Sequence, residues 1–136
     1  MNNETNKLPV FHLAIPTHDL DLSVEFYEGK IGAKLARRYD DRTTFRFFEH
    51  QIVCHLAPDK IDKNPQMYPR HFGMTFREKE QYDALYEMAK ANGCEFFKDL
   101  FIRFGDLPER HSTFFLQDPS NNLLEFKYYD EDRFVY

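Results

Sequence analysis

The chain lacks the features that a membrane span or a nucleic-acid surface requires. Its 136 residues contain no apolar run close to the ~20 residues that cross a bilayer. Lysine and arginine number 18 against 23 acidic residues, and no basic cluster exceeds the pair Arg37-Arg38. Because nucleic-acid binding depends on clustered positive charge, the sequence predicts neither a membrane protein nor a nucleic-acid partner.

Cysteine is also scarce. The two residues, Cys54 and Cys94, both lie in strand-like segments, which is typical of reduced, buried thiols rather than of a disulfide framework. The stretch from Met1 to Lys7 is polar and lacks the apolar core of a signal peptide. We therefore expect a cytoplasmic protein.

Aromatic and aliphatic residues, by contrast, are abundant. The chain is 42% hydrophobic, with 15 Phe and 8 Tyr, which is enough apolar surface for a real interior. At this length the chain forms one compact domain, or two small modules that share a core. Some of the aromatic side chains are available to line a cavity.

Hydrophobic periodicity and turn residues predict the same order of elements twice. In the first module, residues 8–58, we expect a strand at 10–16, a helix at 22–28 and strands at 34–39, 43–49 and 51–57. A proline-rich linker follows at 59–69. In the second module, residues 70–129, we expect a strand at 71–76, a helix at 78–92 and strands at 94–97 (extending as far as 104), 112–117 and 122–129. Residues 130–136 form a charged tail.

The two modules also begin with similar residues. Phe11-His12-Leu13-Ala14-Ile15 matches Arg70-His71-Phe72-Gly73-Met74, and Gln51 to Leu56 matches Asn121 to Phe126, which aligns His55 with Glu125. Two copies of one βαβββ module are therefore predicted, giving an α+β fold. The matched polar residues are expected around a pseudo-twofold axis.

Alternation along the strands places the matched polar residues on the less apolar faces. His12, His71 and Glu125 each oppose a hydrophobic face, and a carboxylate in an otherwise apolar strand is costly unless a positive charge pairs with it. These three residues are the predicted metal ligands. His55 is either a fourth ligand or a base beside the metal.

From Val10 to Tyr129 the sequence resembles the vicinal oxygen chelate superfamily, which includes glyoxalases, bleomycin resistance proteins and extradiol dioxygenases. The matching segments are Phe11-His12-Leu13-Ala14-Ile15-Pro16, Phe26-Tyr27 before Ile31-Gly32, His71-Phe72-Gly73, and Asp118 to Phe126. Asn121 replaces the glycine usual in the last segment, and Asn also tolerates left-handed backbone. The resemblance implies paired modules that form a curved, barrel-like mixed sheet around a central cavity.

The resemblance also implies a cofactor and an assembly. His12, His71 and Glu125 match the superfamily's two histidines and carboxylate, a set that suits one divalent ion, with Fe(II) favoured and Mn, Ni, Co or Zn as alternatives. The substrate is expected to be a small molecule with two adjacent oxygens. Small chains of this superfamily often build the cavity from two subunits, and the terminal Phe134 and Tyr136 fit the interface of a homodimer.

Three functions remain open at this point. The first is an oxidoreductase similar to extradiol dioxygenases, and the second is a glyoxalase-like lyase or isomerase acting through a metal-bound enediolate. The third is a non-catalytic small-molecule binding dimer similar to bleomycin resistance proteins. His55 replaces the acidic fourth ligand of glyoxalases, which favours the first.

Proton transfer has three candidates: Glu125, His55 and His111. Phe115 stands where ring-cleaving dioxygenases carry an acid–base tyrosine, and a phenyl ring has no proton to donate. Either His111 or Tyr128 performs that task, or the reaction is not catechol cleavage. The candidate substrate-binding residues are Arg103, Tyr128 and Phe115.

Overall fold

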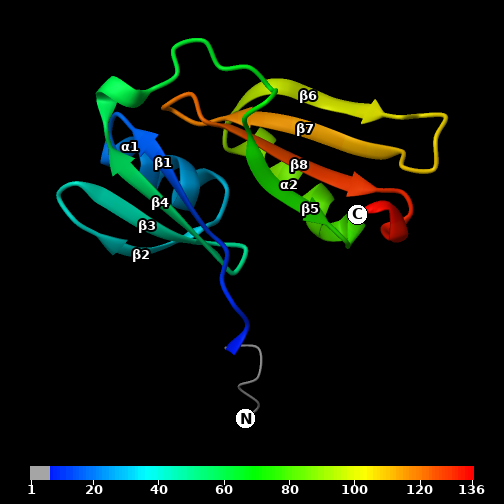
Figure 1. Cartoon of the computed structure of the whole chain (residues 1–136), viewed down its shortest axis with the longest axis horizontal. Helices are drawn as coiled ribbons and strands as arrows, with labels where there is room; N and C mark the ends of the chain where they lie inside the picture. The colour runs from blue at the N-terminus through cyan, green and yellow to red at the C-terminus, as the bar shows by residue number, and fades with distance from the viewer. Residues whose placement is uncertain (1–6) are drawn as a thin grey trace.

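The computed structural model describes residues 7–136 (Figure 1), so the polar stretch starting at Met1 lies largely outside the described residues. The first module consists of β1 (His12–Thr17), α1 (Leu20–Val24), the π-helix η2 (Glu25–Lys30), β2 (Lys34–Arg38), β3 (Arg42–Phe47) and β4 (His50–Leu56). A short 3-10 helix, η3 (Pro58–Lys60), opens the linker. The second module consists of β5 (Phe72–Phe76), α2 (Lys79–Ala91), β6 (Glu95–Arg103), β7 (His111–Gln117) and β8 (Leu123–Tyr129). The 3-10 helix η4 (Asp132–Phe134) follows in the tail.

Each module builds one mixed sheet of four strands, in the orders β1-β4-β3-β2 and β5-β8-β7-β6. In both sheets the first and last strands of the module run parallel, and the other pairs are antiparallel. The predicted α+β fold of two paired βαβββ modules is thereby confirmed.

The helix predicted at 22–28 is the element that differs most from expectation. It begins at Leu20, where the Asp19 carboxylate accepts a hydrogen bond from Leu22 N at 3.0 Å, and it widens into η2 after Val24. Ile31 N donates to Phe26 O, five residues back, which is the wide turn of a π-helix. Such a widening has no signature in hydrophobic periodicity, so the sequence could not predict it.

Three turns have the backbone that their residues predict. Gly32 and Gly93 follow the two helices with positive φ values of 81° and 68°, and Asn121 has φ 65° in the turn before β8. Asn121 therefore occupies the left-handed conformation that the family's glycine usually takes.

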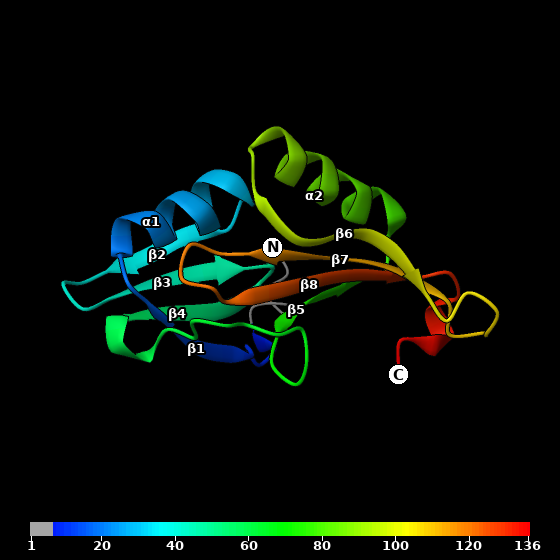
Figure 2. The same ribbon diagram turned by 90° about the horizontal axis from the view of Figure 1, so that it is seen from above.

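Both helical segments cover the same side of the molecule (Figure 2). The opposite faces of the two sheets carry no helix, and the sheets remain open toward that side rather than closing on each other within one chain. Within residues 7–136, no helix has the length and apolar character needed to cross a membrane.

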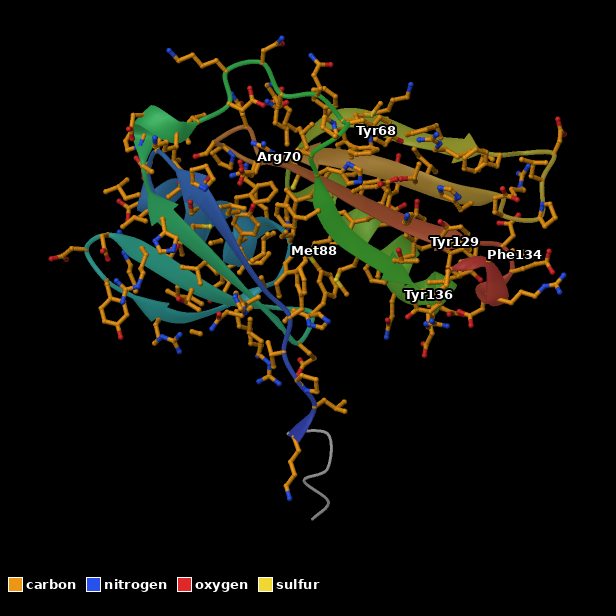
Figure 3. All side chains as sticks on the ribbon, viewed as in Figure 1. Tyr68, Arg70, Met88, Tyr129, Phe134 and Tyr136 are labelled. Atoms are coloured by element: carbon orange, nitrogen blue, oxygen red, sulfur yellow. The ribbon has the colours of Figure 1, made fainter. Side chains whose placement is uncertain are left out.

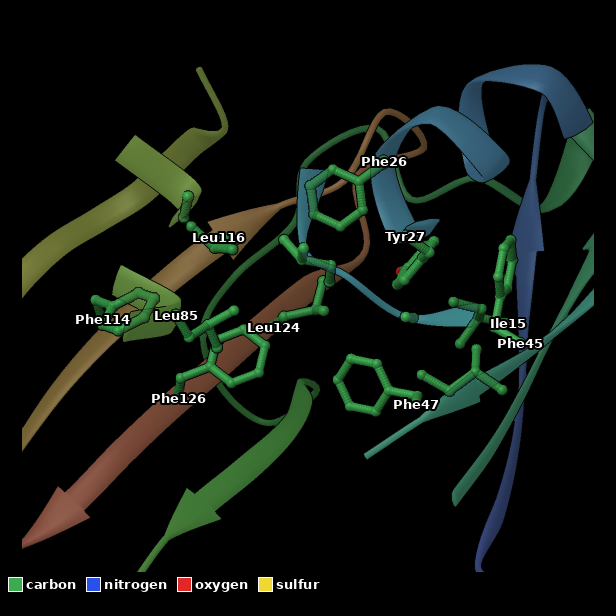
Figure 4. Close-up of a cluster of buried hydrophobic side chains, with 14 of the residues drawn as sticks. Ile15, Phe26, Tyr27, Phe45, Phe47, Leu85, Phe114, Leu116, Leu124 and Phe126 are labelled. Carbon is green, nitrogen blue, oxygen red and sulfur yellow. The ribbon is translucent and has the colours of Figure 1, made fainter. Parts of the chain in front are cut away.

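The hydrophobic core runs without interruption from one module to the other beneath these helices (Figure 4). Phe26, Phe45 and Phe47 of the first module belong to the same buried cluster as Phe114 and Phe126 of the second. The rings of Phe47 and Phe126 lie 6.2 Å apart and join the two halves directly. The modules are therefore packed as one domain.

Polar contacts reinforce this junction at the turn between β7 and β8. Asn122 Nδ2 donates to Pro16 O at 3.0 Å, and Ser120 Oγ lies 3.1 Å from Thr17 Oγ1 and 2.7 Å from His18 Nδ1. Thr17 and Ser120 are buried. The start of β8 is thus held against the end of β1.

Strands β5 and β8 approach each other closely at Gly73, which pairs with Glu125. A β-carbon added at Gly73 would overlap the backbone carbonyl of Glu125. We expect Gly73→Ala to force β5 away from β8 and to lower the free energy of unfolding by roughly 2 kcal/mol or more. Urea unfolding followed by circular dichroism measures the change.

Gly29→Ala in η2 is the matched control, because a β-carbon there meets no atom within 4 Å. It should leave stability unchanged or raise it by about 0.5 kcal/mol, since alanine has less backbone freedom to lose on folding. An equal loss in both variants would show that the close approach of β5 and β8 is not the cause.

Candidate functional site

The candidate site centres on a histidine and a glutamate, His71 and Glu125, whose side chains contact each other at the second sheet. His71 directly precedes β5 and Glu125 lies in the middle of β8, and His71 Nε2 is 2.9 Å from Glu125 Oε1. The Glu125 side chain is only 7% exposed, against 24% for His71. The sequence predicted these two residues as neighbours, and the structure brings them into contact.

Hydrogen bonds fix the orientation of both side chains. His71 Nδ1 lies 2.6 Å from Met67 O, and because a carbonyl oxygen only accepts, Nδ1 must carry the proton. Thr113 Oγ1 donates to Glu125 Oε2 at 2.6 Å from the neighbouring strand β7. A neutral His71 therefore points the lone pair of Nε2 at the carboxylate.

Two electron-rich atoms 2.9 Å apart need positive charge between them. Either a proton lies between the two atoms, or a metal cation takes that place. Imidazole nitrogen and carboxylate oxygen together form a donor set that fits a divalent transition metal. This arrangement, with the outer nitrogen of His71 donating to a carbonyl, is also the usual support of a metal-bound histidine.

Aromatic rings surround the pair. Phe115 is fully buried beside His71, with ring centroids 5.2 Å apart and edge-on geometry. Tyr68 of the linker also packs on His71, edge-on and with ring centroids 5.6 Å apart. These contacts hold the imidazole plane and leave Phe115 as an apolar wall without a proton to donate.

Arg103 reaches this group from the far edge of the sheet. It lies at the end of β6, donates a hydrogen bond to the Tyr68 hydroxyl and places its guanidinium 5.5 Å from the Tyr68 ring centroid. Tyr68 therefore contacts both His71 and Arg103, the residue predicted to bind substrate.

His12 and His55, however, lie on the helix-free face of the first sheet, and both are exposed. Among residues 7–136 of one chain, no three His, Cys, Asp or Glu side chains are grouped so that they could hold a metal. The predicted set of His12, His71 and Glu125 is thus divided within one chain into a pair and a separate histidine.

The strand register corrects one expected correspondence. His12 pairs with Gln51 and Ala14 with Val53 in the first sheet, while Gly73 pairs with Glu125 in the second. With His12 and His71 as equivalents, Val53 occupies the place of Glu125. The predicted match of His55 with Glu125 is wrong by two residues, because sequence similarity alone did not fix the pairing of parallel strands.

By the same register, His55 is the equivalent of Lys127 and pairs with Pro16. That position lies four residues along β1 from His12, or roughly 13 Å at the rise of a strand. His55 is therefore not a neighbour of His12.

Two other candidates lie apart from the pair. Tyr128 is on the opposite, helix-covered face, 6.1 Å from the ring of Tyr82, because strand alternation turns it away from Glu125. His111 shares the face of Glu125 but stacks on Tyr129 at 4.4 Å, near the other end of the strands. Neither side chain is positioned to exchange a proton at the His71–Glu125 pair within this chain.

Sequence reasoning missed two contributors: Thr113 and Tyr68. Thr113 pairs with Lys127 across β7 and β8 and so shares the face of Glu125, which strand alternation and register could have identified. Tyr68 gave no such signal, because its position depends on the path of the linker.

Comparisons with known proteins agree with this geometry. The family model described as Glyoxalase/Bleomycin resistance protein/Dioxygenase superfamily matches residues 10–126. A solved structure from Alicyclobacillus acidocaldarius, described as a glyoxalase/bleomycin resistance protein/dioxygenase, is 59% identical, with a TM-score of 0.91. The match covers 94% of this chain and 96% of the other. A comparison with curated proteins found no match.

More distant structures share the fold. The fosfomycin resistance protein FosX from Listeria monocytogenes is 19% identical, with a TM-score of 0.70 and coverage of 94% of this chain and 97% of that one. A lactoylglutathione lyase from Agrobacterium tumefaciens is 16% identical, with a TM-score of 0.65 and coverage of 88% and 92%. Because the family model matches residues 10–126 of this chain, the chain belongs to the glyoxalase/bleomycin resistance protein/dioxygenase superfamily.

Proposed function

We propose that the protein is a metal-dependent enzyme that acts on a small substrate with two adjacent oxygens. The observation that carries the proposal is the contact of His71 Nε2 with Glu125 Oε1 at 2.9 Å, with the other imidazole nitrogen committed to Met67 O. When bound, a divalent metal supplies Lewis-acid polarisation of the two substrate oxygens. Fe(II) is favoured, and Mn, Ni, Co or Zn would suit the same donors.

His12 completes the ligand set from a second copy of the chain. It stands at the start of β1, as His71 stands just before β5, and both sheets present their helix-free faces on one side of the molecule (Figure 2). A twofold pairing through these faces brings a first module against a second module. The ligands are then His71 and Glu125 of one copy and His12 of the partner subunit.

Exposed apolar side chains support this pairing. At the C-terminus, Tyr136 is fully exposed and Phe134 is half-buried (Figure 3). Burying such groups is the driving force of most protein association, so the homodimer expected from the sequence is part of the proposal.

Within this site the residues have separate tasks. Thr113 holds one carboxylate oxygen of Glu125 and leaves the other directed at His71. Phe115 excludes water from one side of the imidazole. Three protein ligands leave room for a substrate with two donor oxygens and for a further small molecule such as O₂, so a dioxygenase-like reaction is the first assignment.

A glyoxalase-like lyase or isomerase is the second candidate. Phe115 removes the acid–base group expected for ring cleavage, and Glu125 is the only one of the predicted proton-transfer residues that lies at the pair. In that reaction Glu125 would take the substrate proton, and the hydrogen bond from Thr113 would hold the carboxylate in place.

The shared site makes a prediction about metal content. His12→Ala and Glu125→Ala should each purify with less than a tenth of the Mn(II) or Fe(II) that the wild type binds, because each removes a ligand from every site. After the two variants are unfolded together and refolded in equal amounts, about a quarter of wild-type metal content should return, since half of the dimers are mixed and each has one intact site.

Elemental analysis measures the metal, and light scattering measures the mass. His50→Ala is the matched control, because its side chain lies on the other face of the first sheet and bonds to Phe11 N. Full metal content in either single variant, or no recovery in the mixture, would contradict a site shared between two copies.

The chemistry is tested by two assays on the same preparation. We expect Fe(II)-loaded protein to consume O₂ with at least one member of a catechol panel, and Glu125→Gln to abolish this activity. Isomerisation of hemithioacetals is measured in parallel with Ni(II)- and Zn(II)-loaded protein. Turnover only in the second assay would replace the dioxygenase assignment by that of a lyase or isomerase. No activity in either assay would favour the non-catalytic binding dimer.

A further inference from the structure

Cationic side chains of the second module fall into two groups. Five are paired with carboxylates: Arg77, Lys79, Lys90, Arg110 and Arg133. Four others in residues 70–136, a range described throughout, make no ion pair: Arg70, Lys98, Arg103 and Lys127.

Three of these four cations share one surface, the helix-free face of the second sheet. Lys98 pairs with Phe115, Arg103 with His111 and Lys127 with Thr113, and residues paired across strands project to the same side. This is also the face that carries Glu125. The positive charge is thus gathered around the candidate metal ligands.

Lys127 stands on one flank of the His71–Glu125 pair. It lies two residues after Glu125 on the same face of β8, a step of roughly 7 Å along the strand. Its Nζ lies 5.5 Å from the ring centroid of Tyr129. The Lys127 residue itself is half-buried. A lysine stem is long enough to bring the ammonium back toward a group bound at Glu125.

Arg103 stands on another flank, behind Tyr68. Its guanidinium bonds to the Tyr68 hydroxyl, and the Tyr68 ring lies 5.6 Å from that of His71. One hydroxyl contact leaves most of the five guanidinium N–H donors free. A guanidinium presents such donors as a planar fork, which matches two oxygens of a carboxylate or phosphonate.

The carboxylate of Glu125 does not neutralise these cations. One of its oxygens contacts His71 Nε2, and the other accepts from Thr113 Oγ1. The face therefore offers three cations without an ion pair, of which Lys127 and Arg103 flank a carboxylate whose two oxygens already have partners. An anionic ligand is the missing complement.

The geometry points to an anion subsite: Lys127 and Arg103 bind an oxyanion, a carboxylate or phosphonate, that the substrate carries beside its two metal-binding oxygens. This inference rests on the proposed function for the metal-binding part and defines the substrate class more closely. Lys127 and Arg103 then determine specificity, because a neutral analogue leaves both cations unpaired.

Matched probes test the subsite by calorimetry on Mn(II)-loaded dimer. Catechol has the two adjacent oxygens alone, and 3,4-dihydroxybenzoate adds a carboxylate. Wild-type protein should bind 3,4-dihydroxybenzoate about tenfold more tightly or better, as expected for a charge-assisted contact. Lys127→Gln with Arg103→Gln should abolish that preference, measured as the ratio of the two affinities in the same variant, so that a shift at His71 caused by loss of the Arg103–Tyr68 hydrogen bond affects both ligands alike.

Lys79→Gln on α2 is the control, since it removes an exposed lysine from the helix-covered side. It should keep the full preference. A preference that survives in the double variant, or a wild type that does not discriminate, overturns the subsite.

Benzoate and phenylphosphonate, which lack adjacent oxygens, separate this inference from the proposed function. If the Mn(II)-loaded protein fails to bind catechol, the metal assignment fails, yet weak binding of either probe that is lost in the double variant still supports the subsite. The tighter of the two probes identifies the oxyanion as carboxylate or phosphonate. Equal binding of both probes to wild type and double variant overturns the subsite.

Discussion

A buried carboxylate, Asp118, holds the two modules in one arrangement. Its Oδ2 accepts from the Tyr27 hydroxyl of η2 at 2.7 Å, and its Oδ1 accepts from the backbone N–H groups of Ser120 and Asn122 at 2.8 and 2.9 Å. Burial raises the pKa of Asp118 although these hydrogen bonds oppose it. Asp118 therefore stabilises the β7–β8 turn through its backbone partners and links this turn to the first module through Tyr27.

The candidate site depends on that turn. Because β8 begins directly after it, the position of Asp118 sets the register in which Glu125 meets Gly73 and Phe115. The close approach of β5 at Gly73 and the hydroxyl of Thr113 then leave the carboxylate one orientation, toward His71. The Glu125 carboxylate would be costly to bury without such support, because an unpaired carboxylate in this position would lose its solvation.

The sequence was sufficient for the elements and for the faces of the strands, since both follow from local periodicity and from glycines such as Gly32. It paired His71 with Glu125 correctly. It failed where the outcome depended on non-local geometry: the register that assigns Val53, not His55, to the place of Glu125, and the linker path that brings Tyr68 to His71. Neither property is contained in any short segment of the chain.

The separation of His12 from the pair has a physical consequence for the proposed site. Such a site, built from two copies of the chain, would exist only while the copies are associated, so the helix-free faces would serve both assembly and substrate binding. Unpaired cations such as Lys127 would weaken an interface that had no ligand, because their desolvation is not compensated. The anionic substrate inferred above would neutralise them and remove this cost, so substrate binding and the association of the two copies would stabilise each other.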